Sequence, residues 1–275
     1  MSGGPSKGRS PGRIVVASYN IHQCIGTDGI RDARRIAEVI LALDADVIAL
    51  QEVDSWPGAG TEPVQMEFLA QTVGLHAISG PTVERQDGHY GNVLLTRLPV
   101  LDVRKLDLTV FRREPRGALD VHLDTGGAPL RVIATHLGLL PSERRYQVQR
   151  ILETVADDDG AVDAVTVLLG DINEWFVMGR PLRWLHARFG RGAGGPTYPS
   201  WLPMLSLDRV WVRPKTALRR FRIHATTVSR RASDHLPVSA EVAVGPRRAF
   251  SGSGPTLMSS GSAAGGDDAE AGDGR

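Results

Sequence analysis

The stretch VTVLLGDIN, residues 165–173, is a short apolar run followed directly by polar residues. Its apolar residues do not alternate with polar ones, which is typical of a β-strand covered on both faces. The dipeptide Gly170-Asp171 alone would be an ordinary turn. The runs VIAL (residues 47–50) and VIATHL (residues 132–137) have the same continuous apolar character. Together these runs predict a protein built around buried sheets.

Outward from these runs, the sequence predicts many short strands with helices between them. The expected strands are Arg13–Asn20, Asp46–Val53, Gly91–Leu98, Val100–Leu106, Gly117–Leu123, Leu130–Leu137, Val165–Gly170, Asp208–Val212, Phe221–Val228 and Pro237–Val244. The expected helices are Asp32–Leu43, Glu62–Val73, Ser142–Val155 and Gly179–Phe189. The first helix has apolar residues at helical spacing, and Ser142 is a suitable N-cap for the third. This pattern favours two packed sheets covered by helices, an α+β arrangement.

The composition is that of an ordinary globular protein. Of the 275 residues, 41% are hydrophobic and 23% are charged, and the formal net charge is +1. No global positive field therefore favours nucleic acid. A single cysteine, Cys24, excludes an internal disulfide framework and a zinc site built from thiolates. Because the sequence has neither an apolar run of roughly 18 residues nor a signal-peptide core, we expect a cytoplasmic protein.

The two ends of the chain differ in composition from its middle. Residues 1–12 and 245–275 are rich in glycine and serine, and such segments bury too little apolar surface to offset the entropy lost on ordering. We therefore expect a disordered N-terminal tail, one domain over residues 13–244 and a disordered C-terminal tail. No internal repeat is evident, so a single core is expected.

Polar side chains stand where the apolar runs begin or end. Asn20, Glu52, His136 and Asp171 each stand at or next to the end of a predicted strand, and Asp208 begins one. Taken singly, they are ordinary turn residues, solvated strand ends or core histidines. An isolated carboxylate or imidazole beside buried strands costs several kcal/mol unless it is paired or binds a metal. Because ligands gather at strand ends in layered sheet proteins, we expect these residues to share one site.

The same residues belong to six short motifs in a fixed order. They are Tyr19-Asn20, Gln51-Glu52, Thr135-His136, Gly170-Asp171-Ile172-Asn173, Leu207-Asp208-Arg209 and Ser233-Asp234-His235. Over residues 14 to 243 this order resembles the endonuclease/exonuclease/phosphatase superfamily of DNase I-like proteins. Ile172 stands where phenylalanine is common, which exchanges one apolar residue for another. The stretches HYGNVLLTRLPV (89–100) and ASDHLPV (232–238) are similar to a bacterial cytoplasmic subgroup.

The resemblance implies a four-layer αββα sandwich of two mixed sheets with a metal-dependent phosphoesterase site at one edge. Asn20, Glu52 and Asp234 are then the expected metal-binding residues. The chemistry agrees, because a carboxylate suits Mg²⁺ or Mn²⁺, which prefer oxygen ligands. His235 is the expected general base, and Asp208 is expected to hold its imidazole in the productive tautomer.

The remaining candidates would act on the phosphate, the water and the rest of the substrate. His136 is expected to donate to a non-bridging phosphate oxygen. Asp171 and Asn173 are expected to orient the attacking water or to contact a second ion, and Asp171 could instead protonate the leaving group. Arg116, Asn173 and Trp175 are candidate substrate contacts. For Arg116 and Trp175, a surface position and ordinary packing are the alternatives.

The sequence leaves three functions open. The leading one is a divalent-metal-dependent phosphodiesterase acting on a small phosphoester or on a phospholipid or inositol-phosphate headgroup. An endonuclease or exonuclease is disfavoured, because duplex binding relies on several basic contacts and the chain has only three lysines (Lys7, Lys105 and Lys215). A non-catalytic binding domain is disfavoured because all six motifs are retained. We expect a monomer without a transmembrane segment.

Overall fold

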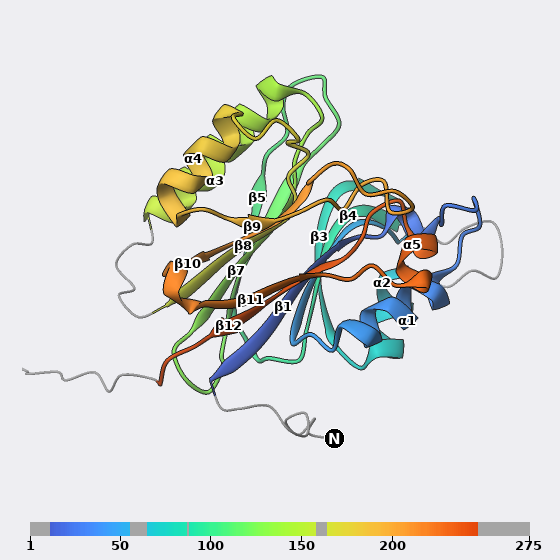
Figure 1. The fold of residues 1–275 in the computed structure, drawn as a ribbon, viewed down its shortest axis with the longest axis horizontal. Helices are drawn as coiled ribbons and strands as arrows, with labels where there is room; N and C mark the ends of the chain where they lie inside the picture. The colour runs from blue at the N-terminus through green and yellow to red at the C-terminus, as the bar shows by residue number, and fades with distance from the viewer. Residues whose placement is uncertain (1–11, 56–64, 87, 158–163, 247–275) are drawn as a thin grey trace, which may run out of the picture.

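The computed structural model describes residues 12–55, 65–86, 88–157 and 164–246, which fold into two sheets with flanking helices (Figure 1). The strands are β1 (Arg13–Asn20), β2 (Val47–Asp54), β3 (His76–Arg85), β4 (Gly88–Thr96), β5 (Val100–Asp107), β6 (Gly117–Leu123), β7 (Leu130–His136), β8 (Val165–Asp171), β9 (Ala193–Gly194), β10 (Asp208–Arg213), β11 (Leu218–Ile223) and β12 (Val238–Ala243). The helices are α1 (Ala33–Leu43), α2 (Gln65–Val73), α3 (Pro141–Asp157), α4 (Arg180–Phe189) and α5 (Thr227–Ala232), with 3₁₀ turns η1 (His22–Cys24) and η2 (Lys215–Ala217).

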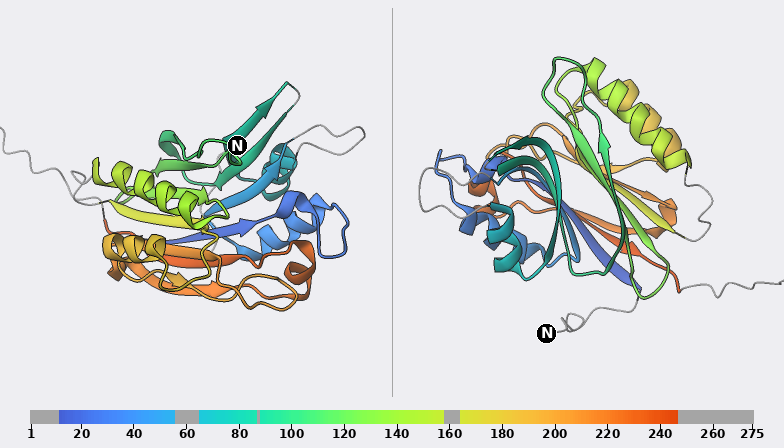
Figure 2. Two further views of the ribbon diagram at one scale, coloured as in Figure 1. Left: turned by 90° about the horizontal axis from the view of Figure 1, so that it is seen from above. Right: turned by 180° about the vertical axis from the view of Figure 1, so that it is seen from behind.

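The architecture is the predicted four-layer αββα sandwich. Each sheet has six strands, in the orders β11-β12-β1-β2-β4-β3 and β5-β6-β7-β8-β10-β9. Helices α1, α2 and α5 cover the outer face of the first sheet, and α3 and α4 cover that of the second (Figures 1 and 2). Both sheets are mixed, since β1 with β2 and β7 with β8 are parallel pairs within otherwise antiparallel neighbours. The expected fold class is therefore confirmed.

The alternation of side chains along each strand determines which residues reach the space between the sheets. On β1, Val16 belongs to the core between the sheets, whereas Ala17 packs beneath the helices of the first sheet. On β8, Val167 and Leu169 face the same inter-sheet core. Side chains two residues apart lie on one face of a strand. The last inward position of β8 is therefore Asp171, which continues the core face to the edge of the sheets.

The strand register brings the polar ends of these strands side by side. His136 on β7 pairs with Asp171 on β8, and Asp171 pairs with Asp208 on β10. Gly170 makes the close approach of β7 and β8 feasible. Its φ is +147°, and a Cβ built there would lie 1.9 Å from the carbonyl oxygen of Thr135. Only glycine fits directly before Asp171 in this arrangement.

One predicted strand runs past its end in the structure into a helix. The expected strand Phe221–Val228 ends at Ile223, because α5 begins at Thr227. Thr226 caps that helix, with its hydroxyl accepting from the Ser229 amide at 3.0 Å. Such a capping box is a strong local start signal for a helix.

Ser142 is not the N-cap of the third helix, because α3 begins at Pro141. The carboxylate of Glu143 instead accepts a hydrogen bond from the Leu140 amide at 2.8 Å.

Strand β3 was not predicted, since its Gly80-Pro81 dipeptide is typical of a turn. The two predicted tails, apart from Gly12, Gly245 and Pro246, and the first residues predicted for the second helix lie outside the described residues.

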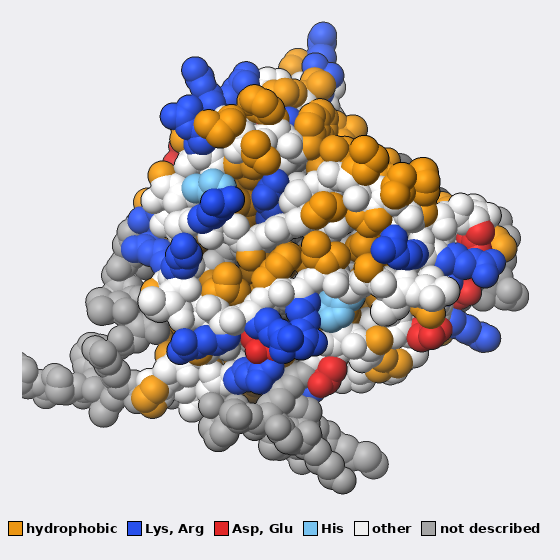
Figure 3. All heavy atoms as spheres, in the orientation of Figure 1, with side chains coloured by type: hydrophobic (Ala, Val, Ile, Leu, Met, Phe, Trp, Pro, Cys, Tyr) orange, Lys and Arg blue, Asp and Glu red, His pale blue; other side chains and the backbone are white. Residues whose placement is uncertain are grey.

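Loops at the polar edge carry exposed hydrophobic side chains. Trp175, Phe176, Val177 and Met178 are 52–67% exposed, and residues 201–205 include further exposed ones, such as Trp201 at 63%. Figure 3 shows hydrophobic side chains grouped on this side of the molecule. We call residues 175–178 and 201–205 the apolar rim. Among the described residues, no helix is long and apolar enough to cross a membrane.

Candidate active site

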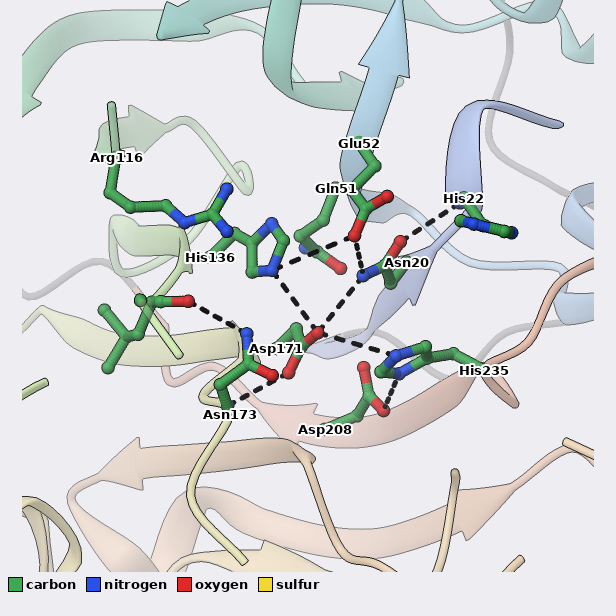
Figure 4. A network of polar contacts seen from close by, with 12 residues as sticks. Asn20, His22, Gln51, Glu52, Arg116, His136, Asp171, Asn173, Asp208 and His235 are labelled. Carbon is green, nitrogen blue, oxygen red and sulfur yellow. Dashed lines mark hydrogen bonds and ion pairs between the residues drawn. The ribbon is translucent and has the colours of Figure 1, made fainter. Parts of the chain in front are cut away.

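Seven of the predicted site residues meet at the edge where β1, β2, β7 and β8 end and β10 begins (Figure 4). They are Asn20, Glu52, His136, Asp171, Asn173, Asp208 and His235. All but Glu52 are buried. Both sheets contribute, so the centre depends on how the two sheets pack against each other.

A local irregularity directs Glu52 toward the centre. The register of β2 against β4 shifts between Leu50 and Val53, and Glu52 has a φ of +57°. A β-bulge of this kind re-aims a side chain at the end of a strand. Asn20 then connects the sheets, because its Nδ2 donates to Glu52 Oε1 at 2.9 Å and to Asp171 Oδ2 at 3.1 Å.

His235 and Asp208 form a buried pair. His235 Nδ1 lies 2.9 Å from Asp208 Oδ2, and its Nε2 lies 3.7 Å from Asp171 Oδ2. Burial by itself lowers the pKa of His235, but the carboxylates of Asp208 and Asp171, with a smaller contribution from Asp234, outweigh burial and raise it to about 10. The ring of Tyr198 packs against that of His235 with centroids 5.0 Å apart. The second ring nitrogen of His235, Nε2, is directed toward Asp171.

Asp171 is the most central carboxylate of the group. Burial, with a contribution from the charge of the nearby Asp208, raises its pKa to about 6 against the opposing charge of His235. Its Oδ1 accepts from the Asn173 amide at 3.0 Å. Asn173 has a φ of +53°, a conformation that asparagine tolerates, and its Nδ2 donates to the Leu137 carbonyl at 2.9 Å. The turn after β8 is therefore held in place by the aspartate and the asparagine of the GDxN motif.

His136 faces the same carboxylates but is held in the neutral state. Its Nε2 lies 3.5 Å from Asp171 Oδ2 and 4.0 Å from Glu52 Oε1. Complete burial lowers the pKa of His136 well below its ordinary value, and the charges of Arg116 and His235 lower it further. A neutral imidazole can still donate one N–H to a ligand.

The other three predicted residues occupy different positions. Arg116 is buried and makes two hydrogen bonds to Glu114, at 2.9 and 3.0 Å, beside the small cavity that His136 lines. Asp234 is one-third exposed, with its Oδ1 3.9 Å from His22 Nδ1. Trp175 lies apart from this cavity, where its ring contacts the Arg144 guanidinium at 5.2 Å.

Two polar residues of the site had no predicted role. Tyr90 and Asn92 line the small cavity together with Glu52 and Arg116. Burial, followed by the charge of Glu52, raises the pKa of the Tyr90 hydroxyl, so it is a neutral donor. Asn92 donates to the Gly117 carbonyl at 3.0 Å. Both belong to the HYGN stretch of β4. Polar residues within a strand were the signal that could have assigned them to the site.

The donor atoms of the centre suit a hard divalent cation. The ligand atoms of Asp171, Asp208 and His235 all lie within 4.8 Å of one another. Asp208 Oδ1 is enclosed and has no hydrogen-bond partner among the described residues. Carboxylate oxygens outnumber the cationic groups here, and oxygen is the donor that Mg²⁺ and Mn²⁺ prefer. The residues present therefore fit a divalent metal ion.

Two face-to-face sheets with a buried centre of acids and histidines at one edge define the DNase I-like class of phosphoester hydrolases. The chain belongs to the Endonuclease/Exonuclease/phosphatase family, whose model matches residues 17–235. Members of this family are hydrolases that act on phosphoester bonds, and they generally depend on a divalent metal ion.

Individual proteins resemble the chain over most of its length. The uncharacterized protein YbhP of Escherichia coli (strain K12) is 30% identical over 227 residues, covering 75% of this chain and 87% of YbhP. The endonuclease/exonuclease/phosphatase of Beutenbergia cavernae DSM 12333 superposes with a TM-score of 0.67 at 24% identity, over 85% of this chain and 72% of that one. The mannosyl-6-phosphatase Bt3783 of Bacteroides thetaiotaomicron VPI-5482 gives 0.67 at 16% identity, over 82% and 98%. These two structures support the fold.

Proposed function

We propose that the protein is a divalent-metal-dependent phosphodiesterase of small phosphoesters, with phospholipid headgroups as favoured substrates. The excess of acid at the centre carries this proposal. Asp171 and Asp208 are buried beside a single protonated histidine, and Glu52 adds a third carboxylate. Uncompensated buried charge is unfavourable unless it coordinates a metal or finds a partner. A cation bound here would also attract a phosphate.

Glu52, Asn20 and Asp234 would hold the ion, which we expect to be Mg²⁺, with Mn²⁺ as a substitute. The Glu52 side chain is 19% exposed and that of Asp234 is 33% exposed, so each carboxylate is open to solvent and to a hydrated ion. Carboxylate and amide oxygens match the preference of these ions. When bound, the ion would supply positive charge that stabilises the phosphate in the transition state.

His235 would act as the general base, with Asp208 as the residue that orients it. The hydrogen bond at Nδ1 leaves Nε2 to accept a proton from the attacking water. A base has to be neutral, whereas the neighbouring carboxylates favour the imidazolium. Positive charge held by Glu52 and Asp234 would oppose that preference and lower the pKa toward the working range. Asp171 and Asn173 would orient the water near Nε2.

His136 and Arg116 would stabilise the phosphate oxygens. The neutral His136 would donate its Nε2 hydrogen to a non-bridging oxygen, where charge develops in the transition state. The planar guanidinium of Arg116 suits bidentate contact with phosphate. Its present partner, Glu114, is 53% exposed, so a phosphate could compete for these donors.

The apolar rim supports a substrate with an apolar part. Trp175 and Trp201 stand on loops that follow and precede the catalytic motifs, and both are more than half exposed. Tryptophan suits the boundary between water and lipid, because its ring is apolar and its N–H is polar. The exposed aliphatic side chains of the rim would contact acyl chains and have no face on which a base could stack. The name of one structurally similar protein, a mannosyl-6-phosphatase, is consistent with a small phosphoester.

A substrate panel with the purified chain and Mg²⁺ or Mn²⁺ tests this proposal. It should contain phospholipid vesicles, inositol phosphates, a generic phosphodiester, plasmid DNA and abasic duplex DNA. We expect turnover of the lipid or small phosphoesters, and a higher KM for lipid in Trp201→Ala. Leu101→Ala is the matched control, because this exposed residue lies on β5, outside the apolar rim. Nicking of plasmid with tight, steeply salt-dependent duplex binding would identify a nuclease instead.

A further inference from the structure

A buried arginine lies on the face of β10 that the catalytic centre does not use. Asp208 points between the sheets, whereas Arg209 and Trp211 point outward beneath α4, as the alternation along a strand requires. Arg209 is only 8% exposed. Its Nε and Nη2 are enclosed and have no hydrogen-bond partner among the described residues. Burial lowers the pKa of Arg209, and the charges of Glu174 and Asp208 oppose this without accepting from Nε or Nη2. A buried guanidinium normally has a hydrogen-bond acceptor, so these unused donors favour an anionic ligand.

A cavity of about 450 Å³ adjoins this arginine. We call it the Arg209 cavity, and its lining includes Arg209, Arg191, His186, Val177, Met178 and Leu182. No carboxylate lines it within the described part of the chain. Basic side chains and a histidine gather with hydrophobic ones on the surface over α4 in Figure 3. The cavity therefore combines positive charge on one side with an apolar wall on the other.

The hydrogen bonds of His186 determine which of its nitrogens is free. Its Nδ1 accepts from Trp211 Nε1 at 3.0 Å and from the Gly192 amide at 3.3 Å. The neutral ring therefore carries its hydrogen on Nε2, which makes that atom a donor. Burial lowers the pKa of His186, and the charges of Arg209 and Arg191 lower it further, which keeps this tautomer neutral.

Ser206 and Gly194 lie beside Arg209. The Ser206 hydroxyl is enclosed and has no hydrogen-bond partner among the residues that the structure describes. Gly194 preserves the space between this hydroxyl and the arginine, since a Cβ built there would lie 3.1 Å from Ser206 Oγ and 3.2 Å from Arg209 Nη1. Arginine donors in a cavity whose described lining contains no carboxylate suit a phosphate group.

We propose that the Arg209 cavity binds the phosphate group of a small organic phosphate. Arg209 and Arg191 contact the phosphate oxygens, and Val177, Met178 and Leu182 contact the organic part. The site is separate from the catalytic centre, because Asp208 and Arg209 point to opposite faces of the second sheet. Val177 and Met178 also belong to the apolar rim, so a bound ligand orders a loop that begins directly after Asn173.

Nuclear magnetic resonance of the full ¹⁵N-labelled chain tests this site without any activity measurement. The indole N–H of Trp211 reports on the cavity through its bond to His186, and a Trp211→Phe variant assigns the resonance. Excess EDTA removes metal ions, and inorganic phosphate or phenyl phosphate is then added at constant ionic strength. We expect a saturable shift of this resonance, with tighter binding of phenyl phosphate because of the apolar wall.

Two variants remove the proposed contacts, and one serves as a control. Arg209→Gln and Arg191→Gln should each weaken binding by about 10-fold or more, since a hydrogen bond to a charged group is lost. Arg191 is exposed, so its replacement leaves the fold intact even if Arg209→Gln does not fold. Arg183→Gln makes the same charge change on α4 but lines a different cavity, and it should bind normally.

Three results would overturn the proposal. They are a Trp211 resonance that does not saturate with either phosphate, a shift that chloride at equal ionic strength reproduces, and unchanged binding in folded Arg191→Gln and Arg209→Gln. Saturation that is lost with the two cavity arginines and kept in Arg183→Gln would support it.

Discussion

Two groups of buried charge in the second sheet are held in opposite ways. Asp120 on β6 and Arg131 on β7 are 0% and 3% exposed on the face beneath α3. They form two parallel hydrogen bonds, of 2.8 and 2.7 Å, so both carboxylate oxygens are used. At the edge of the same sheet, Asp208 bonds His235 through one oxygen and leaves the other without a hydrogen-bond partner among the described residues.

The difference separates a structural charge from a functional one. Asp120 and Arg131 find their hydrogen-bond partners within the protein, so removal of this pair should affect stability and leave chemistry intact. The proposed catalytic centre has more carboxylates than cations, and Asp208 Oδ1 has no hydrogen-bond partner among the described residues, so we expect this centre to bind a cation. Each prediction below tests which of these descriptions applies to a particular residue.

The largest effect is expected for Glu52→Gln, which keeps the shape of the side chain and removes its charge. Activity on a generic phosphodiester should fall by at least about 10³-fold, because a catalytic metal ion supplies several kcal/mol of transition-state stabilisation. The melting temperature should change little, since the Glu52 side chain is partly exposed. Asp102→Asn, which removes an exposed charge from β5, is the control. Full activity of Glu52→Gln, or of the wild type in excess EDTA, would contradict metal binding here.

His235 and Asp208 should behave as one unit. His235→Ala should reduce kcat by about 10²–10⁴-fold, the usual contribution of a general base. Asp208→Asn should also reduce kcat, and the double variant should lose little more than His235→Ala, since coupled catalytic residues are not additive. Kinetics of the two single variants and the double variant provide the measurement. Losses that multiply in folded variants would show that the two residues act separately.

The Asp120–Arg131 pair should respond in the opposite way. Asp120→Ala should lower the free energy of unfolding by about 3–5 kcal/mol, because it removes the carboxylate that accepts two hydrogen bonds from the buried Arg131 guanidinium. Combining Asp120→Leu with Arg131→Met should recover much of this loss. Urea denaturation measures stability, and kcat per folded molecule should stay unchanged. A loss of kcat as large as that of Asp208→Asn would place this pair in the catalytic machinery.

The sequence predicted most strands of this fold because buried strands leave continuous apolar runs. The run at residues 165–170 became most of β8, and Arg13–Asn20 became β1 without a change. β3 was missed because its glycine and proline resemble a turn, although its neighbour β4 stabilises it over nine paired positions. Pairing across a sheet is long-range, so local sequence records it poorly.

The membership of the site was more predictable than its geometry. Asn20, Asp171 and Asp208 could be named because each stands at the end of an apolar run. The bulge that re-aims Glu52 could not be predicted, since it depends on the register of β2 against β4. The separation of Trp175 from the central cavity depends on the loop after β8 and its contact with Arg144. The order of the motifs predicts which residues come together, whereas packing determines the orientation of their side chains.

The smallest expected effect concerns the charge state of His235. Burial opposes its protonation, but Asp208, Asp171 and Asp234 raise its pKa to about 10. Because this pKa exceeds the value of about 6.5 in an unfolded chain, the resulting stabilisation of the metal-free protein is fully present below pH 6.5 or so and disappears as the pH rises through about 10. A divalent ion should lower the proton affinity of His235 at least about tenfold, equivalent to about 1.4 kcal/mol, and Asp208→Asn should lower it without metal. Nuclear magnetic resonance of the imidazole in EDTA and in excess Mg²⁺ measures both shifts. Mg²⁺ should have no effect on the Asp120–Arg131 pair, whose two charged groups already bond each other. Identical titrations of His235 with and without Mg²⁺ would remove the proposed link between metal binding and the general base.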